Sequence, residues 1–227
     1  MPALALALLL AVVPAGLHAM RGEAADASGT AQEPPLADGG PVPQSRTWPA
    51  IRWHHSRALG KPNGGRLVQG VRLPNQGEHY FTWDPILKRS PSRGWRRYGT
   101  DRLVRTLLAV ASEFRAAHPE AARVGVADLS RPQGGDFGPR FGGLGHASHQ
   151  NGLDVDVLYP RLDRLELAMR APAEIDRALA QDLVDRFVRA GARYVFVGPR
   201  THLKGPRRVV QPLVYHDDHM HVRIRPR

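Results

Sequence analysis

Apolar residues recur at helical spacing in two segments, and each segment carries signals that start and stop a helix. The first segment follows Thr100, a predicted N-cap, and ends before Pro119. The second begins near Pro172 and ends before Gly191. The two predicted buried stripes are Leu103, Leu107, Ala111 and Phe114 in the first segment and Ile175, Leu179, Leu183 and Phe187 in the second.

Five shorter runs have the alternation or composition of β-strands. They are residues 79–83, 123–127, 153–158, 194–197 and 219–224. Because helices and strands do not alternate regularly along the chain, their order predicts an α+β fold rather than an alternating parallel one. We expect a single domain with a small antiparallel sheet, flanking helices and long loops.

The N-terminal residues differ in composition from the rest of the chain. Residues 3–13 are apolar and uncharged and are followed by Pro14 and Gly16, as in a secretory signal. This run is well short of the ~20 residues that a membrane span needs. Residues 20–47 are rich in Ala, Gly and Pro, which is typical of a disordered tether, with an extended packed arm as the alternative. We expect a signal peptide at 1–19, a tether at 20–47 and one domain at 48–227.

Histidines and aspartates concentrate in two short motifs, GHASHQNGLDVDV at residues 145–157 and HDDHMH at residues 216–221. Strand alternation places Asp154 and Asp156 on one face, and likewise His219 and His221. His149 would approach them from a glycine-rich loop. A hydrolytic zinc site needs three such ligands, and the chain has no cysteine to offer sulfur. The motifs therefore favour a metal site carried by the sheet, and a solvated edge strand is the alternative.

The two motifs resemble those of the penicillin-insensitive murein endopeptidases, periplasmic zinc enzymes related to D-Ala-D-Ala dipeptidases and lysostaphin-type peptidases. The resemblance extends upstream through residues 60–74 and 125–135. It implies that His149, Asp156 and His221 are the zinc ligands. It also implies that His216 and His219 are active-site histidines that do not bind the metal.

His146 matches a family histidine that is linked to a second metal at a subunit contact. Members of the family complete that second site with an Asp-x-x-His pair, but this chain has no histidine between His149 and His202. We therefore expect one zinc ion. His146 is either part of a second metal site or, like Asp154, a group that orients a ligand or the substrate.

The resemblance implies a reaction, which is hydrolysis of the D-alanyl to meso-diaminopimelyl amide that cross-links peptidoglycan. Zinc lowers the pKa of water and polarises a peptide carbonyl. We expect His216 to act as base or acid and His219 to stabilise the tetrahedral intermediate, although the residues alone leave this division open. Arg131 and Arg140, in the loop at residues 131–145, are candidates to hold a substrate carboxylate.

The net charge of +11 and the pI of about 11.0 suit a carboxylate-rich polymer such as peptidoglycan. The basic cluster Lys88, Arg89, Arg93, Arg96 and Arg97 has a simpler explanation as solvated side chains. Trp95 and Tyr98 beside it hint at nucleic-acid binding, which would leave the histidine motifs unexplained, so we expect no nucleic-acid partner. A D-Ala-D-Ala carboxypeptidase or dipeptidase and a non-catalytic wall-binding protein are the alternatives to the endopeptidase.

Overall fold

A six-stranded mixed sheet is the centre of the computed structural model, which describes residues 50–139 and 146–226. Each of the four inner strands β6, β7, β10 and β8 is antiparallel to its inner neighbours, whereas β4 and β9 form parallel pairs at the two edges. From edge to edge the strands are β4 (Tyr80–Thr82), β6 (Val124–Val126), β7 (Asp154–Leu158), β10 (His219–Ile224), β8 (Ala192–Val197) and β9 (Val210–Pro212).

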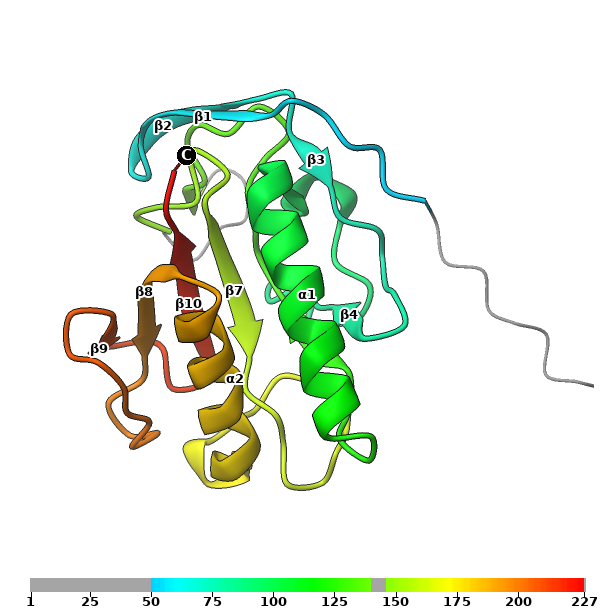
Figure 1. The fold of residues 1–227 in the computed structure, drawn as a ribbon, viewed down its shortest axis with the longest axis vertical. Coiled ribbons are helices and arrows are strands. Elements are labelled where there is room, and N and C mark those ends of the chain that lie inside the picture. The colour runs from blue at the N-terminus through cyan, green and yellow to red at the C-terminus, as the bar shows by residue number, and fades with distance from the viewer. Residues whose placement is uncertain (1–49, 140–145, 227) are drawn as a thin grey trace, which may run out of the picture. The chain divides into compact units, whose positions relative to one another are not determined.

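Two helices of the described chain, α1 (Asp101–Ala117) and α2 (Arg177–Arg189), lie on one face of this sheet (Figure 1). Their predicted stripes are buried, apart from Leu179, which packs partly buried against the same core. Val155 and Val157 of β7 and Met220 and Val222 of β10 point into that core and are fully buried. The opposite face of β7 and β10 is therefore left to their polar residues.

The predicted α+β single domain is confirmed, and all five predicted strands are present. The antiparallel sheet that we expected forms the middle of a larger sheet with parallel edge pairs. The start of the second helix is corrected, because Pro172 belongs to a short 3-10 helix, η3 (Pro172–Glu174). The α-helix begins only at Arg177, after Asp176, whose side chain accepts a hydrogen bond from the Leu179 backbone N–H at 3.1 Å.

Among the described residues, five strands were not predicted, namely β1 (Arg57–Lys61), β2 (Gly64–Val68), β3 (Val71–Arg72), β5 (Tyr98–Gly99) and β9. The β1–β2 hairpin bears mostly exposed residues, so it has no clear alternation of apolar and polar positions. It nevertheless supports the loop that carries His149. The Gln150 N–H donates to the Pro62 carbonyl at 3.0 Å, and Asn151 Nδ2 donates to the Gly60 carbonyl at 3.2 Å.

The basic cluster around residue 96 is not uniformly solvated, which corrects our simpler explanation. Arg96 is fully buried and forms a two-pronged ion pair with the equally buried Asp128. Arg97 is also buried and donates to the Leu73 carbonyl. Trp95 lies beneath the guanidinium of Arg96 at 4.9 Å, so the adjoining basic and aromatic residues pack on one another.

Three sequence predictions fall outside the described residues: the signal peptide at 1–19, the tether at 20–47 and the candidate substrate residue Arg140. Within residues 50–139 and 146–226, neither helix combines the length and the apolar character that a membrane crossing requires.

We predict that Thr100→Ala lowers the free energy of unfolding by about 1 kcal/mol, because the Thr100 side chain accepts a hydrogen bond from the Leu103 backbone N–H at 3.2 Å and caps α1. Urea unfolding followed by circular dichroism measures this change. Thr106→Ala, within the same helix, is the matched control and should not destabilise the protein, because alanine is the better helix former. An equal loss in both variants would contradict a capping role.

Candidate metal centre

The pairing of β7 with β10 brings the two sequence motifs together. In this antiparallel register Asp156 lies opposite His221, and Asp154 lies opposite Arg223. All four side chains extend from the face that the helices leave uncovered. His149 reaches the same place from its loop with a left-handed backbone (φ 66°) and is completely buried. Residues more than 60 positions apart in sequence thus meet at one point.

Three side-chain atoms converge there at nearly equal separations. His149 Nε2 lies 3.1 Å from His221 Nδ1 and 3.2 Å from Asp156 Oδ1, and His221 Nδ1 lies 3.0 Å from the same oxygen. A further grouping of ligand atoms, from His146, His149 and Asp156, fits within 4.8 Å. This part of the structure can therefore hold a metal ion.

The other nitrogen of each converging imidazole is already committed. His149 Nδ1 lies 2.5 Å from the Leu129 carbonyl oxygen, which can only accept, so that nitrogen carries a hydrogen. His221 Nε2 lies 2.9 Å from Asp154 Oδ1, which also accepts from Arg223 Nε at 2.6 Å. In the neutral tautomers, His149 Nε2 and His221 Nδ1 are then both lone-pair acceptors. With the Asp156 carboxylate, they form a trio that needs positive charge at its centre.

The pKa shifts of the three residues also indicate that the trio needs positive charge. Burial lowers the pKa of His149. Burial also lowers the pKa of His221, but its hydrogen bonds to Asp154 and Asp156 outweigh that effect and raise it to about 9. Burial raises the pKa of Asp156, yet the surrounding histidines, first of all His149, hold it well below its usual range. Either a proton on His221 or a metal ion can supply the charge that stabilises the trio.

His146 is held by a residue that the sequence did not single out. Its Nε2 lies 2.8 Å from Asp128 Oδ2 and 3.8 Å from Asp156 Oδ2. Asp128 follows β6 and is fixed by the buried Arg96. Phe137 packs against both His146 and His149, with ring centroids 5.2 Å and 6.0 Å away. Asp128 lies in the upstream segment 125–135 that carries the weaker resemblance, but nothing in its spacing connects it with His146.

His216 and His219 lie beside the trio, with their ring centroids 4.8 Å apart. His216 Nδ1 donates to the Val214 carbonyl at 2.8 Å, and burial lowers its pKa. His219 Nδ1 lies 2.7 Å from the Asp218 carboxylate. Burial lowers the pKa of His219, but the carboxylates of Asp156 and Asp218 outweigh burial and raise it. The two imidazoles are thus biased toward different protonation states.

These histidines open onto a cavity of about 810 Å³. It is lined by His146, His216, His219 and His221, by Arg223, and by an apolar rim that includes Leu213, Val214 and Tyr215. Asp156 and His149 lie behind this lining and are almost fully buried. A ligand in the cavity can thus reach the outer histidines while the carboxylate stays shielded from water.

Arg131 is not among the residues that line this cavity, and its Nη1 donates to the Asp136 carbonyl at 2.8 Å. A substrate role for Arg131 therefore stays a prediction. Arg223, which no sequence motif singled out, lines the cavity and donates a hydrogen bond to Asp154. Its position on β10, two residues after His221, was the available signal.

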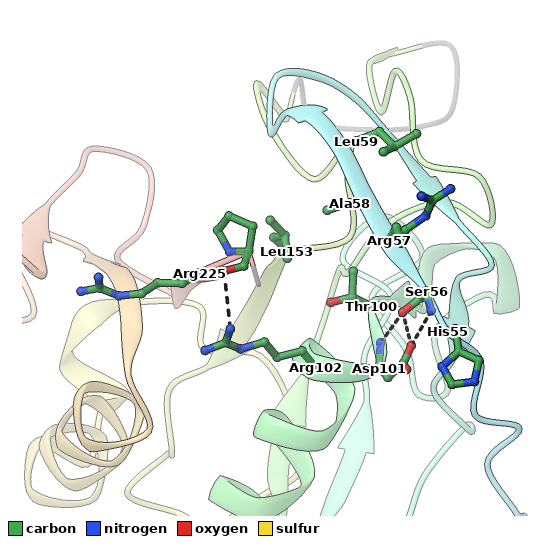
Figure 2. A pocket seen from close by; sticks show the side chains of 11 residues that line it. His55, Ser56, Arg57, Ala58, Leu59, Thr100, Asp101, Arg102, Leu153 and Arg225 are labelled. Atoms are coloured by element: carbon green, nitrogen blue, oxygen red, sulfur yellow. Dashed lines mark hydrogen bonds between the residues drawn. The ribbon is translucent and has the colours of Figure 1, made fainter.

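A separate hollow of about 420 Å³, shown in Figure 2, lies where α1 begins. There Ser56 and Asp101 bond reciprocally. The Asp101 N–H donates to Ser56 Oγ at 2.6 Å, and the Ser56 N–H donates to Asp101 Oδ1 at 3.0 Å. The residues that line this hollow include none of the histidines of the metal centre. It is a structural junction that ties the segment before β1 to the start of the helix.

Comparison with known proteins places the first motif in a family. The family model for penicillin-insensitive murein endopeptidases matches residues 58–192, which include His146, His149 and Asp156. A penicillin-insensitive murein endopeptidase of Escherichia coli O157:H7 (strain EC4115 / EHEC) is 34% identical over 131 residues, 58% of this chain and 41% of the relative. Its counterpart in Escherichia coli (strain K12 / DH10B) is 33% identical over the same shares.

In these alignments the chain spans about two fifths of the length of the curated relatives it matches. His221, which pairs with Asp156 of the first motif across the sheet, lies beyond the matched 58–192, as does His219. The fold supplies the link between the two motifs. Since the family model covers more than half of the 227 residues, the chain belongs to the penicillin-insensitive murein endopeptidase family.

Proposed function

We propose that this chain is a zinc-dependent endopeptidase that hydrolyses the D-alanyl to meso-diaminopimelyl amide in peptidoglycan cross-links. The observation that carries the proposal is the convergence of His149 Nε2, Asp156 Oδ1 and His221 Nδ1 within 3.2 Å, beside a histidine-lined cavity. Family membership supports the substrate class, and the relatives are named for this activity.

The donor set fits zinc. Two imidazole nitrogens and one carboxylate oxygen are common ligands of hydrolytic zinc, and tetrahedral coordination separates such atoms by about 3.4 Å. The three observed separations, 3.0 to 3.2 Å, are close to that value. Both imidazoles are also oriented from behind, by the Leu129 carbonyl and by Asp154, as metal-binding histidines usually are. His149, Asp156 and His221 would therefore hold the ion.

His146 is the less suitable third ligand. Its Nε2 is 2.8 Å from Asp128 Oδ2, nearer than the 3.8 Å to Asp156, so its hydrogen bond is directed away from the trio. We assign it to substrate or ligand orientation, with Asp128 fixing its ring. The Arg96 guanidinium in turn neutralises Asp128, which leaves that carboxylate less suited to a second cation.

The bound zinc ion would supply Lewis acidity for water and for the scissile carbonyl. The remaining steps belong to the protein. His216 donates through Nδ1 to the Val214 carbonyl, so its neutral ring presents Nε2 as a base. His219, held by Asp218, is suited to remain protonated and to donate to the developing oxyanion or the leaving amine. The buried walls around Asp156 keep these charges in a low dielectric, where they act strongly.

The cell-wall substrate lies outside the cytoplasm, so we also propose that residues 1–19 direct export and that the enzyme acts in the periplasm. The apolar, uncharged run at residues 3–13 supports this proposal. Fusion of residues 1–47 to a reporter that is active only after export should give activity, and replacement of Leu8 and Leu9 by Arg should abolish it. Reporter activity that survives this change would contradict the proposal that residues 1–19 are an export signal.

Zinc titration of the purified, metal-free protein tests the ligand set. We predict one equivalent bound by the wild type. His149→Ala, Asp156→Ala and His221→Ala should each lose tight binding, because each removes one of three ligands. His146→Ala should still bind one equivalent. If His221→Ala still binds zinc tightly and His146→Ala does not, then His146 is the third zinc ligand and His221 is not.

Product analysis tests the reaction. We predict that the zinc-loaded protein converts cross-linked peptidoglycan dimers into monomers, as resolved by mass, and that a chelator or Asp156→Ala abolishes the conversion. His216→Ala should lower kcat by about 10²- to 10⁴-fold while the zinc content stays at one equivalent, since it removes the base and leaves the ligands.

Arg189→Ala, which removes an exposed charge on α2, is the control and should behave as the wild type. Shortened stems with the cross-links intact would instead assign the protein as a carboxypeptidase. If the protein binds zinc but forms no product, the remaining alternative is a non-catalytic wall-binding protein.

A further inference from the structure

The segment that carries His216 and His219 separates two hollows. On one side lies the histidine-lined cavity of about 810 Å³, and on the other lies a hollow of about 480 Å³. Val214 and Tyr215 line both. Asp217 and Asp218, which lie between His216 and His219 in sequence, line the second hollow. The proposed reaction centre is therefore adjacent to a second hollow, across Val214 and Tyr215.

Tyr215 forms the ridge between the two hollows, and its conformation is unusual. The residue is 91% exposed and has a left-handed backbone (φ 64°), which is uncommon for a non-glycine residue. The neighbouring Val214 is 59% exposed. An exposed aromatic residue in a disfavoured backbone conformation costs stability. Such strain is concentrated at functional sites, so the conformation of Tyr215 points to a role in function.

Hydrogen bonds to the neighbouring backbone hold the ridge in place. The buried Tyr159 hydroxyl donates to the His216 carbonyl and accepts from the Gly198 N–H, both at 3.2 Å. A Cβ at Gly198 would lie 2.4 Å from that carbonyl, so only glycine lets the two loops approach. The Arg200 N–H also donates to Asp217 at 3.0 Å. Tyr215 is thus presented by a rigid support.

The second hollow contains two arginines beside Asp217 and Asp218, so the formal charges of its lining balance. Arg170 and Arg200 line it together with Pro172 and Pro199. Arg200 pairs with Asp217 at 2.6 Å, but its side chain is 71% exposed, and an ion pair in such a setting contributes little and is readily exchanged. Asp218 is already paired with His219. A carboxylate that enters from solvent would therefore meet the two guanidinium groups.

We propose that this second hollow, with its arginines Arg170 and Arg200 and the Tyr215 ridge, is the arm of the substrate cleft that holds the stem on the amine side of the cross-link. The inference rests on the proposed function. An endopeptidase substrate continues on both sides of the cleaved amide, so its cleft must be open at both ends. The diaminopimelyl residue that supplies the amine carries a carboxylate next to the scissile bond, which the arginines can bind. His219, the proposed donor to that amine, borders this side through Asp218.

Two substrates test the proposal by kinetics. One is a soluble cross-linked muropeptide dimer, and the other is a single stem whose terminal D-alanine is joined to methylamine, which cannot reach the second hollow. Arg170→Ala should lower kcat/KM on the dimer about tenfold and leave the methylamide within twofold of the wild type. Tyr215→Ala, which also removes part of the wall of the histidine-lined cavity, should lower kcat/KM more on the dimer than on the methylamide. Tyr215→Phe should keep most of the activity, because it retains the ring. Arg189→Ala should change neither substrate. Equal losses on both substrates, or no loss on the dimer, would overturn the proposal.

Binding without turnover separates this proposal from the function on which it rests. The probe is an uncross-linked tripeptide stem that ends in meso-diaminopimelate, titrated by calorimetry into the zinc-loaded wild type and variants. Arg170→Ala should weaken its affinity about fivefold or more, whereas Arg189→Ala should not. If the wild type cleaves no dimer but this pattern holds, the endopeptidase function fails and the binding arm stands. If the wild type cleaves the dimer and Arg170→Ala and Arg189→Ala bind the stem equally well, the arm fails and the function stands.

Discussion

The antiparallel pairing of β7 with β10 is the constraint on which the candidate metal centre depends. Its register sets Asp156 opposite His221 and Asp154 opposite Arg223, while Val155 and Val222 between them point into the core. A slip of one residue would expose the valines and bury the charged groups against the helices, at a large cost in free energy. The hydrophobic core and the ligand geometry are therefore specified by the same pairing, and neither can be repacked independently.

The alternation that fixes this register is local, and for that reason the sequence predicts it well. The two helix stripes, the five principal strands and the shared faces of Asp154 with Asp156 and His219 with His221 all follow from spacing within a few residues. The ends of elements depend on single capping residues that the spacing of apolar positions does not reveal. Ile175 continues the apolar stripe of α2, but the chain needs Asp176 as a cap and starts the helix only at Arg177.

Contacts between distant segments were beyond the reach of such patterns. Arg96 stands in a run of basic residues that has every sign of solvation, yet it is buried against Asp128, 32 positions away. Its charge is tolerated because the carboxylate is equally buried and paired by two hydrogen bonds. His146 shares that carboxylate, so its orientation depends on a partner that only the fold brings near. The Arg131 side chain, in contrast, bonds within its own loop rather than lining the cavity.

Under the proposed function, the segment at residues 213–219 joins catalysis and substrate selection in one piece of backbone. Its histidines lie beside the trio of His149, Asp156 and His221, and its exposed apolar side chains form the ridge toward the second hollow. Tyr159 and Gly198 fix it at the His216 carbonyl, so a shift of the ridge would also shift the imidazole. Because hydrogen bonds at a reaction centre tolerate displacements of only a fraction of an ångström, the shape of the cleft cannot vary freely around a constant set of histidines. The choice between a cleft open at both ends and one closed at a chain terminus is thus tied to the placement of His216 and His219.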